Sequence, residues 1–443
     1  MKKLVFPYLL LLSAVAFAQK PFDTPLTLEQ AVDYALNHSP GLSVEKMKDE
    51  AASIEVEESR LQYIPDIYLS GDLRRNLIIP ATPVPAHVFD PSAKEEELMY
   101  LKFNSRYNAS AGVNLRFDLF NPDNIYRVAE KKHQRRIQEY DTEISKEDVK
   151  ERVALAYAEC VIAEEQQKLL RGDTTYYAEM LRNARQLYLK EKISLSGKND
   201  AHRAYNESLA AYLEAAKIAD DRKAELLYLM GMDVTAAHVT SLSLADDIPA
   251  LLGILETKAL PVSDLTSPEV MRQQEVVNLA SLRLKSASWK YAPTLTLNGY
   301  YGTNYYNHAF SLFHNNYWRG NSYIGLSLKV PVTQSFATSK EVSRLRLQQL
   351  MERENLRDIR NSREKERLNE LSLLQVRQEN YRLNRENWEM SLQNAAAVQL
   401  QFEKGHMQQS ELLNEKMIMQ QNRHRFLQSA YDLFSSLILL GVE

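Results

Sequence analysis

Polar and apolar residues alternate in four short stretches of the chain. In the clearest stretch, from Ala109 to Leu119, every second residue is apolar and the residues between them are polar or small. Comparable alternation runs over residues 66–74, 294–305 and 318–330. A period of two is typical of a β-strand with one apolar and one polar face. The pattern therefore predicts four strands, each with an apolar face.

Apolar residues recur at helical spacing over much longer stretches. Long helices are expected over about residues 124–192 and 339–404, each followed by a further helix. At ~1.5 Å per residue, the first would be about 100 Å long. Apolar stripes run along both helices, at Val149, Val153, Tyr157 and Val161 in the first and at Leu368, Leu371 and Leu374 in the second. Such stripes are typical of helix-on-helix packing, and we interpret them as packing seams.

The order of elements occurs twice along the chain. At an offset of 228 residues, eight identities align without a gap, pairing Ser39, Pro40, Ala52, Ser53, Tyr63, Pro65, Leu69 and Gly71 with Ser267, Pro268, Ala280, Ser281, Tyr291, Pro293, Leu297 and Gly299. Prolines and glycines constrain the backbone, so their recurrence indicates a duplicated unit. We expect a first repeat over residues 19–231, a connecting segment over 232–266 and a second repeat over 267–443. Each repeat would follow the order helix, strand, strand, long helix, helix.

The first residues have the pattern of an export signal. Lys2 and Lys3 precede an uncharged, mostly apolar run from Leu4 to Ala16, and small residues stand at Ala16 and Ala18. This arrangement is typical of a secretory signal peptide, here over residues 1–18. The run is shorter than the ~20 residues of a spanning helix. The exported chain is therefore expected to meet a membrane through its strands or at the surface.

The alternating stretches are about as long as the ~9–11 residues of a transmembrane strand. In that setting the apolar residues Val113, Leu115, Phe117, Leu326 and Leu328 would face lipid. Four strands are too few to close a barrel, because the smallest has ~8, and open edges are not tolerated in lipid. Several copies of the chain would have to share one barrel. The alternative is a soluble four-stranded sheet whose apolar face covers a core.

Composition and motifs argue against catalysis and nucleic-acid binding. The 443-residue chain has a net charge of −4, only 13 glycines and one cysteine, Cys160, which we expect to be a small core residue. It contains no GxSxG, Walker, GxGxxG or HExxH motif, and its histidines and methionines have no metal-ligand spacing. We expect no catalytic residues, no cofactor, no metal site and no nucleic-acid partner.

Residues 26–40, LTLEQAVDYALNHSP, and the Tyr63-Ile64-Pro65 turn into a strand resemble the TolC-type outer-membrane efflux family. The duplicated order of elements is similar to that family over residues 26–441. The resemblance implies a mainly α fold with a small β part, assembled as a homotrimer. Twelve strands, four from each chain, would form one outer-membrane β-barrel, continued by a periplasmic α-helical barrel. The connecting segment would belong to an equatorial belt, and residues 74–106 and 307–316 would be external loops.

The resemblance also implies where partners dock and where the duct closes. The turns after the long helices would form the periplasmic tip, where an adaptor (membrane fusion) protein docks; the residues concerned are Lys192, Ile193, Ser194, Leu195, Gly405, His406 and Met407. Lys192 stands where the family usually has glycine. After the second turn the family often carries two acidic residues that face the pore, and Glu411 and Asn414 occupy these positions. Three copies of Glu411 would form a carboxylate ring that favours cations. The alternative is that Glu411 is an ordinary solvated carboxylate.

The expected function is an outer-membrane exit duct of a tripartite efflux or type I secretion system. The duct would conduct substrates passively from the adaptor and the inner-membrane transporter to the exterior, while its strands contact outer-membrane lipid. The alternative is a periplasmic coiled-coil adaptor or scaffold protein without a pore. A third hypothesis, an exported enzyme with a helical scaffold, has no group of residues in its favour.

Overall fold

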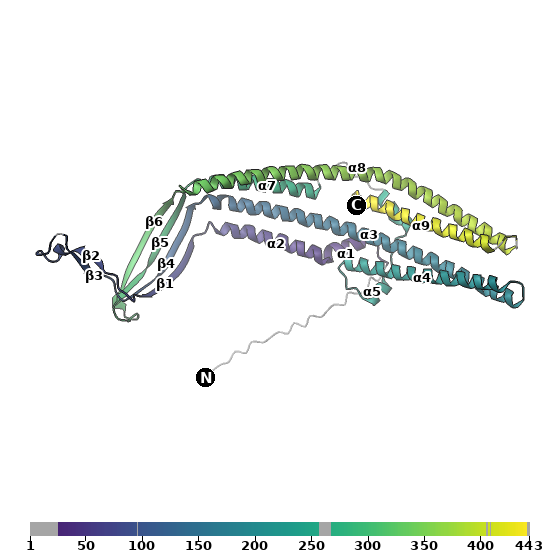
Figure 1. Cartoon of the computed structure of the whole chain (residues 1–443), viewed down its shortest axis with the longest axis horizontal. Helices are drawn as coiled ribbons and strands as arrows, with labels where there is room; N and C mark the ends of the chain where they lie inside the picture. The colour runs from purple at the N-terminus through teal and green to yellow at the C-terminus, as the bar shows by residue number, and fades with distance from the viewer. Residues whose placement is uncertain (1–24, 95, 257–266, 405, 408, 441–443) are drawn as a thin grey trace, which may run out of the picture. The chain divides into compact units, whose positions relative to one another are not determined.

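The computed structural model describes residues 25–94, 96–256, 267–404, 406–407 and 409–440, so the expected signal peptide lies outside the described residues. The described chain is mainly helical with a small sheet part (Figure 1). Its helices are α1 (Leu28–His38), α2 (Pro40–Leu61), α3 (Pro122–Leu189), α4 (Leu195–Leu229), α5 (Ala236–Ser241), α6 (Ile248–Glu256), α7 (Pro268–Trp289), α8 (Gln334–Glu403) and α9 (Gln409–Leu439). Its strands are β1 (Asp66–Arg75), β2 (Thr82–Pro85), β3 (Leu98–Leu101), β4 (Tyr107–Phe120), β5 (Thr294–Asn307) and β6 (Trp318–Lys329). Within the described residues, no helix combines the length and the apolar character that crossing a membrane requires.

The chain divides into two compact units, and each takes segments from both halves of the sequence. The first unit comprises Met1–Lys46, Thr142–Ser267 and Arg360–Glu443, and the second comprises Met47–Asp141 and Pro268–Ile359. The second unit contains all six strands of the described residues, and the first contains the α3–α4 and α8–α9 turns. The compact units therefore do not coincide with the predicted repeats. Corresponding elements of the two repeats, such as their strands, belong to the same unit.

Four antiparallel strands form the main sheet, in the order β1-β4-β5-β6 (Figure 1). Directly paired residues of neighbouring strands share a face. Leu69 pairs with Val113, and Val113 pairs with Tyr301. The same pairing places Ile67, Leu69, Leu73, Ala109, Val113, Leu115, Phe117, Leu295, Leu297, Ile324, Leu326 and Leu328 on one face. The sheet is open, since over the described residues β1 and β6 each pair on one side only.

The apolar face of this sheet is largely exposed in the single chain. The exposed fraction of the side chain is 82% for Leu69, 65% for Leu326 and 66% for Leu328. Large contiguous apolar patches are rare on soluble monomers and mark sites of association with protein or membrane. The sheet therefore presents a surface that is suited to burial in an assembly or in lipid.

The regular alternation breaks near the end of β4. The register shifts between Asp118 and Phe120, and Phe120 pairs with Leu295. A β-bulge inserts one extra residue and moves the following side chains to the opposite face. The expected place of Leu119 in the alternation is therefore wrong, and Phe120 takes that position instead.

A second, two-stranded sheet lies within the segment that the sequence treats as an external loop. Thr82 of β2 pairs with Leu101 of β3, and Pro83 pairs with Tyr100. Proline is tolerated in a strand with a free edge because its missing N–H costs no ladder hydrogen bond there. The prolines of this segment thus hid a hairpin from the sequence analysis.

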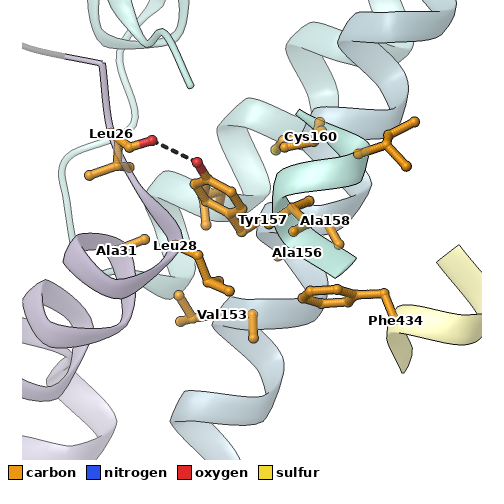
Figure 2. Packing of buried hydrophobic residues seen from close by; sticks show 14 of the residues in the cluster. Leu26, Leu28, Ala31, Val153, Ala156, Tyr157, Ala158, Cys160 and Phe434 are labelled. Carbon is orange, nitrogen blue, oxygen red and sulfur yellow. Dashed lines mark hydrogen bonds between the residues drawn. The ribbon is translucent and has the colours of Figure 1, made fainter. Parts of the chain in front are cut away.

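The core of the first unit gathers around α3, where Val153, Tyr157 and Val161 are buried. Figure 2 shows the Tyr157 side chain pointing toward Leu26, and its hydroxyl lies 2.6 Å from the Leu26 carbonyl oxygen and 2.8 Å from Asp246 Oδ2. Burial, followed by the nearby Asp246 carboxylate, raises the pKa of Tyr157 well above its ordinary value. The neutral phenol therefore ties the first described residues and the connecting segment to α3. The interpretation of this stripe as a packing seam is confirmed.

The apolar stripe of α8 is only partly used in packing. Leu374 is buried and Leu371 packs against the same core, whereas Leu368 is 54% exposed. Spacing alone does not determine where along a long helix the neighbouring helix is close enough to cover the stripe. The interpretation as a packing seam is confirmed at Leu374 and Leu371, and at Leu368 it stays a prediction.

Prolines and capping residues fix where the helices begin. Pro40, Pro122 and Pro268 are the first residues of α2, α3 and α7, where the missing N–H has no helical partner in any case. Thr27 and Gln30 form a capping box that starts α1. Pro40 and Pro268 thus begin corresponding helices in the two halves of the chain.

Gly231 follows α4 in a left-handed conformation. Its φ is +78°, and the N–H groups of Gly231 and Met232 donate to the carbonyls of Tyr228 and Leu227. These two bonds form a Schellman motif, which requires a left-handed residue after the helix. A Cβ at this position would also overlap the carbonyl of His38.

Gly231→Ala is expected to destabilise the protein by about 2 kcal/mol, because the left-handed conformation is unfavourable for alanine and its Cβ would collide with the His38 backbone. Gly172→Ala is the matched control, since Gly172 lies within α3 with open space around it. This change is expected to be stabilising, by up to about 1 kcal/mol. Thermal unfolding followed by circular dichroism measures both; equal effects of the two substitutions would contradict the prediction.

Candidate functional site

The turn between α3 and α4 closes with a left-handed residue that is not glycine. Glu191 has a φ of +55°, and the N–H groups of Glu191 and Lys192 donate to the carbonyls of Tyr188 and Leu187. This is again a Schellman motif, and Glu191, not Lys192 as the sequence indicates, occupies the position that usually belongs to glycine. A non-glycine residue in this conformation costs about 1 kcal/mol. Lys192 is exposed and lies just after the strained residue.

The remaining residues of this turn have separate structural roles. Ile193 packs against a small cluster that contains Leu181 and Ala201. The Ser194 hydroxyl accepts a hydrogen bond from the Gly197 N–H and so caps α4. Leu195, the first residue of α4, is 51% exposed. The turn is therefore closed by local hydrogen bonds and presents an exposed apolar side chain, Leu195, and an exposed cation, Lys192.

The turn between α8 and α9 is described only in part, and Gly405 lies outside the described residues. The His406 N–H donates to the Gln401 carbonyl at 3.0 Å, which is the same backbone bond that Lys192 makes in the first turn. His406 is exposed and Met407 is half-buried. The role of these residues in docking stays a prediction.

The two expected gate residues lie in the first two turns of α9. Glu411 is in the first turn, where the positive end of the helix dipole favours a carboxylate. Glu411 and Asn414 are both exposed, while Leu412 between them is fully buried. A separation of three residues places Glu411 and Asn414 on one side of the helix. The structure thus brings them together on the surface of α9, and their pore-facing role stays a prediction.

A buried ion pair that sequence analysis missed joins α3 to α9. Arg423 is 3% exposed, and its Nη1 donates to Asp173 Oδ2 at 3.0 Å. Gln420 donates to the same carboxylate oxygen. One turn away, the Lys416 ammonium lies 4.5 Å from the centre of the Tyr176 ring, and burial lowers the pKa of Lys416. These contacts hold the beginning of α9 against α3.

Lys416, Gln420 and Arg423 lie at positions i, i+4 and i+7 of α9, a spacing that puts them on one face. The sequence does contain this signal, but a polar stripe of this kind is also what a solvated helix face shows. The partner Asp173 lies 250 residues from Arg423. Only the tertiary structure reveals that this polar face is covered.

A groove of about 870 Å³ adjoins this ion pair within the first unit. Residues of α3, α4 and α9 line it, and the polar ones include Asp200, Arg203, Glu207, Gln420, Arg423 and His424. Burial, together with the Asp173 carboxylate, raises the pKa of Tyr177, which also lines the groove, to about 12. Tyr177 is therefore a neutral hydroxyl at physiological pH and serves as a polar but uncharged wall.

The five residues expected to face lipid lie on the apolar face of the sheet. Phe117 pairs with Leu297 and Leu297 pairs with Leu326, so β4 and β6 present these side chains on the same side. Val113 is 38% exposed, and Leu115 and Phe117 are half-buried within the single chain. Their contact with lipid stays a prediction.

Over the described part of the chain, no group of three or more His, Cys, Asp or Glu side chains is placed to hold a metal ion. Cys160 is fully buried in the core of the first unit, as expected, and burial raises the pKa of its thiol. A buried neutral thiol is a poor nucleophile and a poor metal ligand. Cys160 therefore contributes packing.

The family model described as outer membrane efflux protein matches residues 31–232. The predicted resemblance to the TolC-type outer-membrane efflux family is confirmed. The matched residues include most of α1, the strands β1 to β4, the long helix α3 and α4. No curated protein matches the chain.

Solved outer membrane channels share the fold over nearly the whole chain. The CmeC outer membrane channel of Campylobacter jejuni is 15% identical, with a TM-score of 0.74 over 94% of this chain and 84% of that one. VceC of Vibrio cholerae is 14% identical, with a TM-score of 0.70 over 94% and 95% of the two chains. The open state of the MtrE outer membrane channel of Neisseria gonorrhoeae is 14% identical, with a TM-score of 0.66 over 94% and 88%.

The family match and the shared fold support the predicted location in the outer membrane, with an extension into the periplasm. The solved relatives are described as outer membrane proteins or channels, which fits the expectation that the chain is not an enzyme.

Arg423→Ala is expected to destabilise the first unit by about 3 kcal/mol, because it leaves the buried Asp173 carboxylate without its partner. Lys217→Ala is the control, since the Lys217–Asp221 pair is exposed and its loss is expected to cost less than ~1 kcal/mol. Denaturant unfolding measures both effects. The double variant Asp173→Leu with Arg423→Leu is expected to recover most of the lost stability. If the double variant is as unstable as Arg423→Ala, the unpaired Asp173 carboxylate is not the cause of the destabilisation.

Proposed function

We propose that three copies of this chain form an outer-membrane exit duct of a tripartite efflux or type I secretion system. The single observation that carries the proposal is the open sheet, which over the described residues has two unpaired edges and one exposed apolar face. In hydrocarbon, every backbone N–H and C=O must be paired, so a sheet is stable there only when its edges close. Pairing β6 of one copy with β1 of the next would close twelve strands into one barrel.

In this assembly the apolar face contacts lipid and the polar face lines the lumen. The residues Val113, Leu115, Phe117, Leu326 and Leu328 would lie against outer-membrane lipid. The helices would continue the duct into the periplasm as an α-helical barrel, with residues 232–266 in a belt around it. The mature chain would begin after residue 18, with its two repeats over 19–231 and 267–443. The channel descriptions of CmeC and MtrE support this arrangement.

The duct itself would be passive, and its partners would supply the energy. A periplasmic adaptor protein would dock at the two helical turns, where the exposed Lys192, Leu195 and His406 are available for contact. An inner-membrane transporter would deliver the substrate through that adaptor. The short, capped turn at Ser194 supports docking because little chain entropy is lost when a preformed surface is bound.

Cell fractionation followed by mass measurement tests the duct. The mature protein is expected in the outer membrane, to need detergent for extraction, and to have the mass of three chains in the detergent complex. A water-soluble monomer in the periplasm would contradict the proposal and would favour the adaptor or scaffold alternative.

Glu411 and Asn414 would act at the periplasmic entrance as a threefold ring. Three carboxylates in a narrow pore favour cations over anions. In planar bilayers, Glu411→Gln is expected to lower the cation-to-anion permeability ratio, and Asn414→Asp is expected to raise it. Glu411→Asp retains the charge and is the control. Unchanged ion selectivity in both test variants would leave Glu411 as an ordinary solvated carboxylate.

A further inference from the structure

Tyr300 of β5 lies flat on the polar face of the main sheet, over two glycines. A Cβ built on Gly112 would lie 2.7 Å from the Tyr300 ring, and one built on Gly302 would lie 2.5 Å from its hydroxyl oxygen. Gly112 and Gly302 are directly paired across β4 and β5. The two missing side chains leave a shallow seat, and the Tyr300 ring fills it.

Tyr323 extends this aromatic surface onto the next strand. It is the direct partner of Tyr300 in the β5–β6 register, and the two ring centroids are 6.0 Å apart with an interplanar angle of 25°. Tyr323 is 59% exposed. The seat holds Tyr300 close to the sheet, and Tyr300 is half-buried. We call Tyr300 and Tyr323 the tyrosine patch.

The surroundings of the tyrosine patch are polar and mostly uncharged. β5 has no charged residue from Thr294 to Asn307. Asn298, next to the patch on the same face, donates from its side-chain amide to the Ser327 hydroxyl at 3.0 Å. The next row contains two opposite charges, Arg116 and its direct β1 partner Asp66, and Arg116 also faces Asp118 at 3.9 Å. Chemistry of this kind suits a neutral ligand, because a charged one would gain no dedicated counter-charge.

We propose that the tyrosine patch is a transient binding site for uncharged aromatic solutes on the wall of the duct. The location in the lumen rests on the proposed function, whereas the patch itself rests on the contacts above. Aromatic rings prefer offset stacking on a ring face, and one such contact changes affinity by about threefold to tenfold. Two rings give a weak site, which retains an aromatic solute briefly and still releases it, as passage requires.

Current block in planar bilayers tests the tyrosine patch on the full-length mature protein. The probe is N-acetyl-L-tryptophanamide, and N-acetyl-L-leucinamide is the neutral, non-aromatic comparison. The aromatic amide is expected to block the wild-type current at a concentration about threefold or more below that of the leucine amide. Tyr323→Ala is expected to remove this difference, while Tyr323→Phe is expected to keep it.

Tyr301→Ala is the matched control, because Tyr301 is the neighbour of Tyr300 in β5, lies on the opposite face and is 76% exposed. It is expected to leave the block unchanged. Equal block by both amides in the wild type, or loss of selectivity in Tyr301→Ala but not in Tyr323→Ala, would overturn the proposal. If the wild type carries no current, the proposed duct fails. Saturation-transfer NMR of the tryptophan amide on wild-type and Tyr323→Ala protein in detergent then decides the patch separately: a weaker signal in the variant supports it, and equal signals overturn it.

Discussion

The unsatisfied backbone edges of the main sheet are the constraint on which the account of this protein depends. Within the part of the chain that the structure describes, β1 and β6 carry N–H and C=O groups with partners on one side only, and one face of the sheet is apolar and exposed. Water could solvate the edges but not the face, and lipid could solvate the face but not the edges. A shared barrel satisfies both requirements at once. The proposal that several copies share one barrel therefore rests on one hydrogen-bonding argument.

In the helical part of the molecule, local residues at the ends of the helices determine where the helices begin and end. Gly231 and Glu191 both take left-handed conformations after long helices, and Thr27 and Ser194 cap helix starts. These caps and left-handed residues act through hydrogen bonds to neighbouring residues of the chain, and so determine the conformation of the turns locally. The α3–α4 turn thus holds its shape even though Glu191 lacks the conformational freedom of glycine. A rigid turn of this kind is well suited to a docking surface.

Much of this architecture could be predicted from the sequence, because its two periods are unusually clear. Alternation over β4 indicated a strand with two unlike faces, and the stripe at Val153, Tyr157 and Val161 indicated a packing seam. The errors have physical causes. A bulge moved Phe120 into the place of Leu119, since alternation carries no information about an inserted residue. Prolines hid the β2–β3 hairpin, whose free edges tolerate them.

The candidate site was less accessible to sequence analysis. Glu411 and Asn414 were found through resemblance and spacing, but Arg423 and Asp173 are too far apart in the chain for any local pattern to pair them. The seat of Tyr300 was hidden for a similar reason, because Gly112 and Gly302 come from different halves and meet only through the register.

Amide hydrogen exchange on the detergent-solubilised assembly tests the edge-pairing claim most directly. The account predicts that the outward-pointing N–H groups of β1 and β6 exchange as slowly as the N–H groups of the inner strands β4 and β5. Fast exchange at alternate positions along β1 and β6, beside slow exchange in β4 and β5, would mean that the edges stay open and would contradict the shared barrel.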